Sequence, residues 1–303
     1  MQSSKPRVPQ NLEEYRVARQ NFFTKEGWRA GQEFQPRPTD VLISPFGKSG
    51  TTWLQQIVHG LRTRGSMDFE EITDVTPWIE VAHDYKGWDM EDEQVADPRL
   101  FKSHLNWDEI PKGGRYIYSI RNPLDVAVSS YRFFEGWWFE TGSIGIEDFT
   151  RDNIENYETS GYWQHISSWW EQRDNKDVLL LCYEEMKADL VGTVKTVARF
   201  MDIALDDELL ELVVRQSSKE FMLAHKSHFD DHLLQAHFER RGATPTSPTA
   251  SKVMPKSKNP ERYTLSPELK DELDAIWDKM ITQRFGFKDY SELRTAIAEL
   301  PRT

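Results

Sequence analysis

The sequence predicts a single α/β domain with a central, mostly parallel sheet flanked by helices. Short apolar segments alternate along the chain with longer segments of helical periodicity, a pattern typical of a parallel sheet covered on both faces. The 303 residues are 38 % hydrophobic and 29 % charged, which suits one sizeable core and disfavours disorder. No repeat or linker divides residues 1–303, so we expect one domain.

Four buried strands are expected from short apolar segments at 41–46, 99–103, 115–120 and 178–183. The residues before them, about 1–35, form a predicted N-terminal extension. Helices are expected where apolar residues recur at helical spacing, and Gly65 should end the first of them. The predicted helices cover residues 53–61, 123–135, 162–173, 184–201, 206–217 and 267–285.

Two of these helices begin with specific signals. Asn122 and Ser266 are positioned as N-caps, and each precedes a proline, which fits the first helical position. Residues 244–260 are rich in proline, serine and threonine and predict a long loop before the last helix.

Composition excludes several classes of protein. One cysteine, Cys182, leaves no internal disulfide and no multi-cysteine metal cluster, which suits a reducing compartment. The start of the chain lacks the apolar core of a signal peptide, and the longest aliphatic run, Val178 to Leu181, is far shorter than the roughly 20 residues of a membrane span. We therefore expect a cytoplasmic protein without membrane insertion. A net charge of −12 gives no bulk attraction for nucleic acid or anionic membrane.

Positive charge is concentrated in one segment, residues 240–262, which we call the basic loop. Such a cluster is a candidate anion-binding segment, and the alternative is a solvated surface loop. Between residues 239 and 262 the chain has six basic and two acidic residues: Arg240, Arg241, Lys252, Lys256, Lys258 and Arg262 against Glu239 and Glu261.

Reactive polar residues follow three of the four predicted strands. Lys48 follows the first strand, Lys102 and His104 lie at the end of the second, and Arg121 follows the third. Open α/β sheets bind ligands at the carboxyl ends of their strands, so this arrangement indicates a functional site there.

The segment FGKSGTTW after the first strand is a candidate phosphate-binding loop. Gly47 and Gly50 allow a tight turn, and the following helix supplies free N–H groups and its dipole. The alternative is a plain helix cap, and the usual GxxxxGK[ST] order is not met. The segment adds charged and hydroxyl donors from Lys48, Ser49, Thr51 and Thr52.

Arg121 opens a second candidate anion contact. Ser129 lies two turns into the helix that Asn122 caps, and Arg121 and Ser129 are both placed to reach one phosphate. The alternative is that Arg121 pairs with a carboxylate such as Asp125.

These motifs together resemble the cytosolic-type sulfotransferases, and the likeness is greatest to bacterial members. It spans nearly the whole chain, and the order and spacing of the motifs carry it. They are KSGTTW at 48–53, FKSH at 101–104, RNPLDVAVSSYRFF at 121–134, LCYEEMKADL at 181–190 and a terminal helix that contains GF.

The resemblance implies transfer of a sulfuryl group from 3′-phosphoadenosine 5′-phosphosulfate (PAPS) to a hydroxyl or amine, without a metal. It implies His104 as the base that takes the acceptor proton. It places Lys48 at the oxygen bridging sulfur and phosphorus, Lys102 at the sulfuryl oxygens, and Ser129 against Lys48 before the acceptor arrives. The implied donor-binding residues are Lys48, Ser49, Gly50, Thr51 and Thr52 at the phosphosulfate, Arg121 and Ser129 at the 3′-phosphate, and Trp53, Tyr183 and Ser217 at the adenine.

The sequence departs from the family at three places. Lys219 replaces the aromatic residue of the adenine motif TSFxxM, and Gly47 stands where proline is usual. The family segment RKGxxG has two possible registers within the basic loop. One uses Arg240 and Arg241. The other, which the spacing favours, falls at Met254, Pro255 and Lys256 and leaves the charge to Lys252, Lys256 or Lys258.

Two further clusters have functional and structural interpretations. His225, His228 and His232, with Asp230 and Asp231 beside them, allow a zinc site, but a solvated or acceptor-facing loop is favoured. Aromatic clusters most often pack in cores, yet in this family they also line the acceptor pocket, which predicts a partly hydrophobic acceptor. The aromatic residues concerned are Phe46, Trp78, Trp137, Trp138 and Phe139.

Two alternatives come from other functional classes. A P-loop kinase would share the anion site and require Mg²⁺ and ATP, and the missing GK[ST] order counts against it. A nucleotide-binding module without catalysis is favoured by Lys219 and the altered loop near residue 254, and disfavoured by the presence of Lys48, Lys102 and His104.

Overall fold

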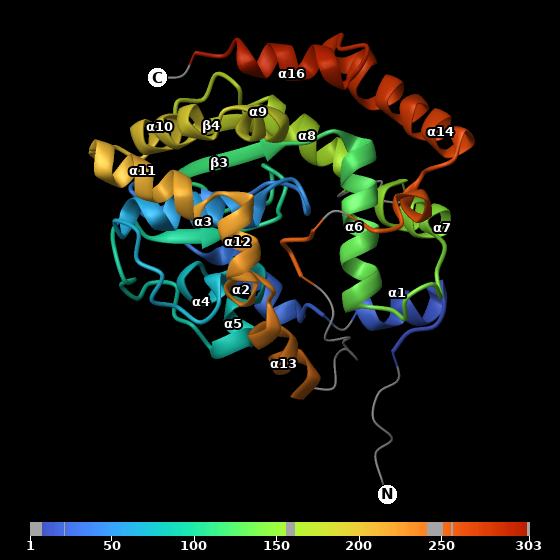
Figure 1. Cartoon of the computed structure of the whole chain (residues 1–303), viewed down its shortest axis with the longest axis horizontal. Coiled ribbons are helices and arrows are strands. Elements are labelled where there is room, and N and C mark those ends of the chain that lie inside the picture. Colours follow the sequence, from blue (N-terminus) through green and yellow to red (C-terminus); the bar gives the residue numbers. More distant parts are fainter. Residues whose placement is uncertain (1–7, 21, 156–160, 241–250, 256, 302–303) are drawn as a thin grey trace, which may run out of the picture.

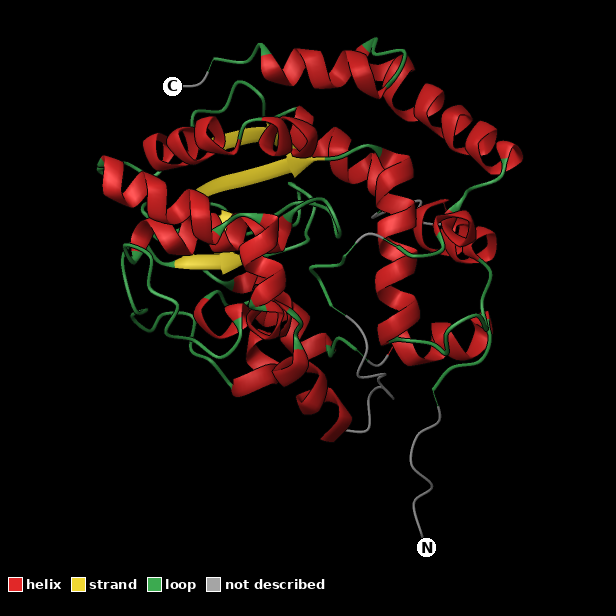
Figure 2. Cartoon of the chain, in the orientation of Figure 1, coloured by secondary structure: helices red, strands yellow, loops and turns green. Residues whose placement is uncertain are grey.

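A computed structural model describes residues 8–20, 22–155, 161–240, 251–255 and 257–301. Its centre is a four-stranded sheet in the order β2-β1-β3-β4, and every neighbouring pair is parallel (Figure 2). The predicted parallel sheet is confirmed, with three strands shorter than expected. The strands are β1 (Val41–Ile43), β2 (Leu100–Lys102), β3 (Arg115–Ile120) and β4 (Val178–Cys182).

Strand β1 lies in the middle and pairs on both sides. Ile43 is opposite Lys102 of β2 and opposite Ile117 of β3. After β1 the chain forms β2 on one side of it, and it then crosses to form β3 on the other side. The connections therefore leave in opposite directions at the boundary between β1 and β3. In open parallel sheets this is where ligands bind.

Alternate residues of β1 enter different cores, as the strand period of two requires. Val41 and Ile43 join a cluster between the sheet and three helices, whereas Leu42 joins a larger, aromatic-rich cluster on the opposite face. Helices therefore cover both faces, as expected, and Figure 1 shows α6 standing beside the sheet. The helices of the first cluster are α3 (Thr51–Arg62), α10 (Leu190–Phe200) and α11 (Asp207–Gln216), and the second includes α8 (Tyr162–Trp170) and α6 (Pro123–Trp137).

The described part of the N-terminal segment, predicted as an extension, is helical and packed into the fold. Tyr15 and Phe22 are buried in the larger cluster. Gly31 lets the second of the two helices touch a later helix, because a Cβ there would lie 2.5 Å from the carbonyl oxygen of Ile79. The elements are α1 (Leu12–Gln20), α2 (Lys25–Glu33) and their later neighbour α5 (Ile79–Lys86).

Both predicted N-caps are confirmed. Asn122 accepts hydrogen bonds from the first turn of α6, and Ser266 accepts one at the start of α14. The helix predicted at 184–201 is two helices, because Asp189 ends one and caps the next by accepting a hydrogen bond from Gly192. The helix predicted at 267–285 runs as α14 (Pro267–Trp277), the π-helical η4 (Asp278–Thr282) and α15 (Gln283–Phe285).

Several short helices were not predicted, because they have no long apolar period, although Ser218 caps the helix at 219–224 and Asp289 caps the helix at 290–298. Among the described helices, none has the length and apolar character that crossing a bilayer requires. The remaining elements are α4 (Ile72–Val75), α7 (Ile146–Thr150), η1 (Arg151–Glu155), α9 (Tyr183–Ala188), α12 (Lys219–Ala224), η2 (Lys226–Phe229), α13 (His232–Arg240), η3 (Pro260–Tyr263) and α16 (Tyr290–Ala298).

Candidate active site

The loop after β1 contains the predicted phosphate-binding residues. Gly50 caps α3 with a φ of 106°, and a Cβ there would lie 3.0 Å from Cδ2 of Tyr183, so both conformation and space require glycine. Gly47 has no positive φ, and a Cβ on it would meet no atom within 4 Å. The left-handed residue is instead Lys48, with a φ of 67°. Ser49 N–H donates to the Phe46 carbonyl over 3.1 Å and closes a turn that contains Gly47, so both glycines lie where the turn was predicted, but glycine is required only at Gly50.

This loop contains buried donors that no other described residue satisfies. Ser49 Oγ and Thr51 Oγ1 are buried without a hydrogen-bond partner among the described residues. Ser119 Oγ holds the loop by donating to the carbonyl of Ser49 over 2.6 Å. Gly50 brings no side-chain cap and Thr52 is half-buried in the first turn of α3, so the first N–H groups of the helix stay available. An unpaired buried polar group costs about 1–3 kcal/mol, and an anion here would remove that cost.

Arg121 lies across this loop at the end of β3. Its guanidinium donates to the carbonyl of Lys48 over 2.9 Å and lies over the ring of Tyr183, 4.4 Å from the centroid. Its Nε is buried without a partner among the described residues, and no ion pair with Asp125 forms there. Ser129 is half-buried in α6, two turns beyond the cap. Arg121 thus keeps a free donor beside the loop.

The residues predicted at the adenine come together. Trp53 Nε1 donates to the carbonyl of Ser217 over 2.8 Å, and the rings of Trp53 and Tyr183 meet edge to face with centroids 5.6 Å apart. Ser217 Oγ is buried without a partner in the described part of the chain. Trp53 also packs against two hydrophobic clusters, so both interpretations of this residue, core packing and adenine contact, stay open.

Two lysines project into apolar surroundings near the loop. Lys48 Nζ lies 3.9 Å from the centroid of Phe133, and Lys102 Nζ lies 3.8 Å from that of Trp78. Burial, together with the charges of Lys252 and Arg121, lowers the pKa of Lys48 to about 7. Burial and the charge of Lys252 lower the pKa of Lys102 to about 7 as well. An incoming anion would restore the positive charge of both.

His104 is held as a neutral imidazole. Its Nδ1 lies 2.7 Å from the carbonyl oxygen of Pro45, which can only accept, so Nδ1 carries the proton and Nε2 has a free lone pair. Burial and the charge of Lys102 lower the pKa of His104 well below its usual value. The backbone N–H of His104 donates to Glu80 Oε1 over 2.7 Å, and Trp78 packs against its ring edge to face. This geometry fits a base.

Residues 38–285 match the family model of the sulfotransferase domain. The chain belongs to the sulfotransferase family. It is 34 % identical over 215 residues to sulfotransferase 1B1 of Mus musculus, which covers 64 % of this chain and 69 % of the relative. It is 32 % identical over 203 residues to sulfotransferase 2A1 of Homo sapiens, covering 64 % and 70 %. The prediction of a sulfotransferase enzyme is confirmed.

Solved structures show the same fold. A retinol dehydratase in complex with androsterone and the inactive cofactor PAP has a TM-score of 0.66 at 18 % identity, covering 91 % of this chain and 88 % of that chain. A mouse sulfotransferase complexed with PAP has a TM-score of 0.63 at 20 % identity, covering 92 % and 95 %. The predicted α/β architecture of this sulfotransferase is therefore shared with them.

Sequence reasoning missed one buried histidine beside the site. His165 stacks on Tyr118 and packs edge to face against Phe46, with centroids 5.4 and 5.6 Å away. Burial lowers its pKa to about 3, and its Nε2 has no partner among the described residues. Its position on the apolar face of α8, one residue before Ile166, is the only signal, and that pattern is typical of a core histidine.

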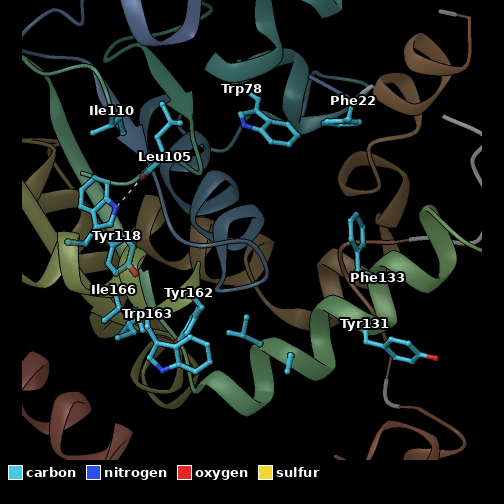
Figure 3. Packing of buried hydrophobic residues seen from close by; sticks show 14 of the residues in the cluster. Phe22, Trp78, Leu105, Ile110, Tyr118, Tyr131, Phe133, Tyr162, Trp163 and Ile166 are labelled. Atoms are coloured by element: carbon cyan, nitrogen blue, oxygen red, sulfur yellow. Dashed lines mark hydrogen bonds between the residues drawn. The ribbon is translucent and has the colours of Figure 1, made fainter. Parts of the chain in front are cut away.

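An aromatic wall links the two lysines of this sulfotransferase. We define it as Trp78, Phe22, Trp137 and Phe133, whose successive ring centroids are 5.9, 5.7 and 5.1 Å apart. Figure 3 shows Phe133 projecting from α6 toward Phe22 and Trp78. Lys102 contacts one end of the wall and Lys48 the other. Of the other predicted aromatics, Phe139 packs in the core.

The three histidines considered for zinc do not share a helix face. They fall at the end of α12, in η2 and in α13. His225 Nδ1 lies 2.9 Å from the Phe221 carbonyl, and His228 Nδ1 lies 2.8 Å from that of Phe69. His232 Nδ1 lies 2.7 Å from Asp230 Oδ1, and with Glu71 these two bring potential ligand atoms within 4.8 Å of one another. We assign no metal to this group, because His232 and Asp230 are hydrogen-bonded to each other and Glu71 Oε2 accepts from the N–H of Leu233; Glu71 Oε1 has no partner among the described residues.

The basic loop divides into exposed and paired cations. Arg240 ends α13 and is exposed, as is Lys258, while Arg241 and Lys256 lie outside the described residues. Lys252 pairs with Asp231, and Arg262 with Glu135. Lys219, the departure in the adenine motif, begins α12 and is exposed. Neither register of the loop is established by these positions.

We expect Gly50→Ala to lower the free energy of unfolding by roughly 1–3 kcal/mol, because alanine at positive φ is strained and its Cβ would press on Tyr183. Gly47→Ala is the matched control and should change it by less than about 0.5 kcal/mol. Denaturant unfolding of both variants measures the difference, and equal effects would contradict this account of the loop.

Proposed function

We propose that this sulfotransferase transfers a sulfuryl group from PAPS to a hydroxyl or amine of a small, partly hydrophobic acceptor. The observation that carries the proposal is the convergence of three features at one sheet edge. These are a loop whose buried donors lack partners among the described residues, a half-buried and a buried lysine of lowered pKa, and a neutral histidine. The PAP bound to similar proteins supports a nucleotide of this kind.

The donor would lie along the carboxyl ends of β1 and β3. Its phosphosulfate would accept hydrogen bonds from the loop, from Lys48 through Thr52, where the unpaired hydroxyls lie. Its 3′-phosphate would meet Arg121, whose Nε lacks a partner among the described residues, and Ser129. The adenine would contact Trp53, Tyr183 and the Ser217 region.

The transfer is an in-line displacement at sulfur, which needs alignment and charge stabilisation more than covalent catalysis. The acceptor hydroxyl loses its proton to Nε2 of His104, whose Nδ1 is held by the Pro45 carbonyl. Lys48 stabilises the charge that grows on the bridging oxygen, and Lys102 contacts the sulfuryl oxygens. The aromatic wall between the two lysines supports an acceptor with an apolar body.

The alternatives receive less support. A kinase would need Mg²⁺ ligands, and the loop keeps the order that departs from GK[ST]. A module without catalysis does not require His104 to be neutral with Nε2 free, yet burial and the charge of Lys102 favour the neutral ring, and the Pro45 carbonyl holds its proton on Nδ1. The cytoplasmic location and the greater likeness to bacterial members stay predictions from the sequence.

The first test is nucleotide preference. Calorimetry with adenosine 3′,5′-bisphosphate (PAP) and with ATP, with and without Mg²⁺, should show binding of PAP that is independent of the metal and roughly tenfold or more tighter than that of ATP, because Arg121 provides for the 3′-phosphate. A preference for ATP with Mg²⁺ would instead establish the kinase alternative.

PAP binding should take up protons above neutral pH. The pKa of Lys48 is about 7 in the free protein, and the bound phosphate beside it raises that pKa. Affinity should therefore be nearly constant below pH 7 and fall from pH 7 to 9, by up to about tenfold per unit, as Lys48 gains a proton on binding. Calorimetry at pH 8 in two buffers of different ionisation enthalpy measures the uptake, and Lys48→Met should reduce it. A flat profile without proton uptake would be inconsistent with a lowered pKa of Lys48 in the free protein.

His104→Ala should lower kcat on a simple phenol that the wild type accepts by roughly 10²–10⁴-fold, since His104 acts only on the acceptor proton. The Kd for PAP should change by less than about threefold. His225→Ala, an exposed histidine, is the control and should keep wild-type kcat. Turnover of His104→Ala within about tenfold of wild type would remove it from the mechanism.

A further inference from the structure

A buried ion pair lies beside the site and has no part in the mechanism above. Lys252 Nζ contacts Asp231 Oδ1, and the two side chains are only 7 % and 3 % exposed. Burying two charges costs free energy that their attraction does not always return, so such a pair is weak support for a purely stabilising role. Thr73 Oγ1 also donates to Asp231 Oδ1 over 2.9 Å. The carboxylate is therefore held from two sides.

The backbone conformation of Asp231 is unusual. Four described non-glycine residues have positive φ, and two of them, Arg64 and Asp202, lie just beyond the ends of α3 and α10, where this conformation is common. The other two are Lys48, in the phosphate loop, and Asp231, with a φ of 58°. Non-glycine residues held in this region are concentrated at functional sites. Asp231 shares that feature with a residue of the proposed donor site.

The contacts of Asp231 place the ion pair on the β2 side of the sheet. Thr73 belongs to α4, and the chain runs from α4 directly to Pro77 and Trp78. The carbonyl of Pro77 accepts the N–H of Lys102 over 2.8 Å, and the ring of Trp78 contacts both the Lys102 ammonium and His104. Arg121 follows β3, on the other side of β1. Lys252 is thus anchored at the end of the site that holds Lys102 and His104.

Residues 251–255 cross from this anchor toward α6. Val253 packs in the cluster that contains Trp53, and the carbonyl of Pro255 accepts from Arg132 of α6 over 3.0 Å. Arg132 is the neighbour of Phe133, on whose ring Lys48 lies. In Figure 1 this segment passes between α12 and α6. The segment that contains Lys252 therefore runs from the side of the site that holds Lys102 toward the side that holds Lys48.

The charges around Lys252 leave room for an anion. Lys252 is the foremost charge acting on the pKa of both Lys48 and Lys102, after burial itself. Burial raises the pKa of Glu71 to about 8, so Glu71 stays largely protonated in neutral solution, and it raises the pKa of Glu80 to about 7, which leaves Glu80 close to half protonated. Asp231 is the ionised carboxylate that remains here, since Lys252 and Lys102 hold its pKa below the usual range although burial opposes this. Three lysine side chains thus share one fully ionised carboxylate, and Lys48 and Lys102 become fully charged only when an anion arrives.

We propose that Lys252 is a third cation at the transferred sulfuryl group, beside Lys48 and Lys102, and that Asp231 is the positioning residue that holds it there. The proposal rests on the proposed function and assigns Lys252 to the sulfuryl end of the donor, rather than to the 3′-phosphate with Lys256 and Lys258. A cation at the sulfuryl oxygens stabilises the group as it passes between the two oxygens.

The test compares two ligands that differ only by the sulfuryl group. By calorimetry at pH 7, Lys252→Met should raise the Kd for PAPS by about tenfold or more and that for PAP by less than about threefold, as loss of one charge-assisted contact predicts. Asp231→Asn should likewise raise the Kd for PAPS by more than it raises the Kd for PAP. Lys252→Arg, which keeps the charge, should restore the PAPS-to-PAP ratio, and the exposed Lys258→Met should leave it at the wild-type value.

If Lys252→Met weakens the binding of PAPS and of PAP equally, the proposal is overturned. Lys252 would then contact the phosphates or contribute to folding alone. No change for either ligand would overturn it as well. A slower transfer with an unchanged ratio would place Lys252 at the acceptor and also refute it. If the wild type prefers ATP to PAP, the proposed function fails together with this assignment, whereas failure of the variants alone leaves the proposed function standing.

Discussion

The parallel pairing of β1 with both of its neighbours is the constraint on which the site depends. Ile43 is opposite Lys102 on one side and Ile117 on the other, so all three strands end at one edge. The common direction of the strands alone brings three groups to this edge: the candidate phosphate loop, Lys102 with His104, and Arg121. An antiparallel neighbour would send its last residue to the opposite edge. Ser119 then ties the loop to β3 through the Ser49 carbonyl.

Burial sets the chemistry of the groups that meet at this edge. The same apolar surroundings that pack Trp78 and Phe133 lower the pKa of the lysines on their rings and keep His104 neutral. A chain with net charge −12 can therefore hold several cationic groups together, because most of its acidic residues lie elsewhere and the lysines lose charge until an anion arrives. The aromatic wall serves the core and the site at once, and this is why the sequence alone left both interpretations open for Trp78 and Trp137.

The sequence predicted the elements whose signals are local. Apolar segments located all four strands, and Asn122 and Ser266 marked helix starts that the structure confirms. The prediction failed where a single side chain or a tertiary contact determines whether an element forms or where it ends. Asp189 divides one predicted helix by capping the second half, and the N-terminal helices are held by packing, through Tyr15 and Phe22, rather than by a strong local signal. The two glycines of the loop were predicted to allow the turn, but the positive φ values fall on Lys48 and Gly50, and nothing in the sequence indicated the left-handed conformation at Lys48.

The sequence by itself determined the fold class, the candidate anion-binding loop and the set of residues that gather around it, since period, caps and motif order are properties of neighbouring residues. The tertiary structure alone decided that His104 is neutral with Nε2 free, that Arg121 lies on Tyr183, and that Lys252 is buried against Asp231. These depend on contacts between residues as far apart as Pro45 and His104, or Thr73 and Asp231. Protonation and ion pairing follow from burial and from distances between charges, and a one-dimensional pattern contains neither.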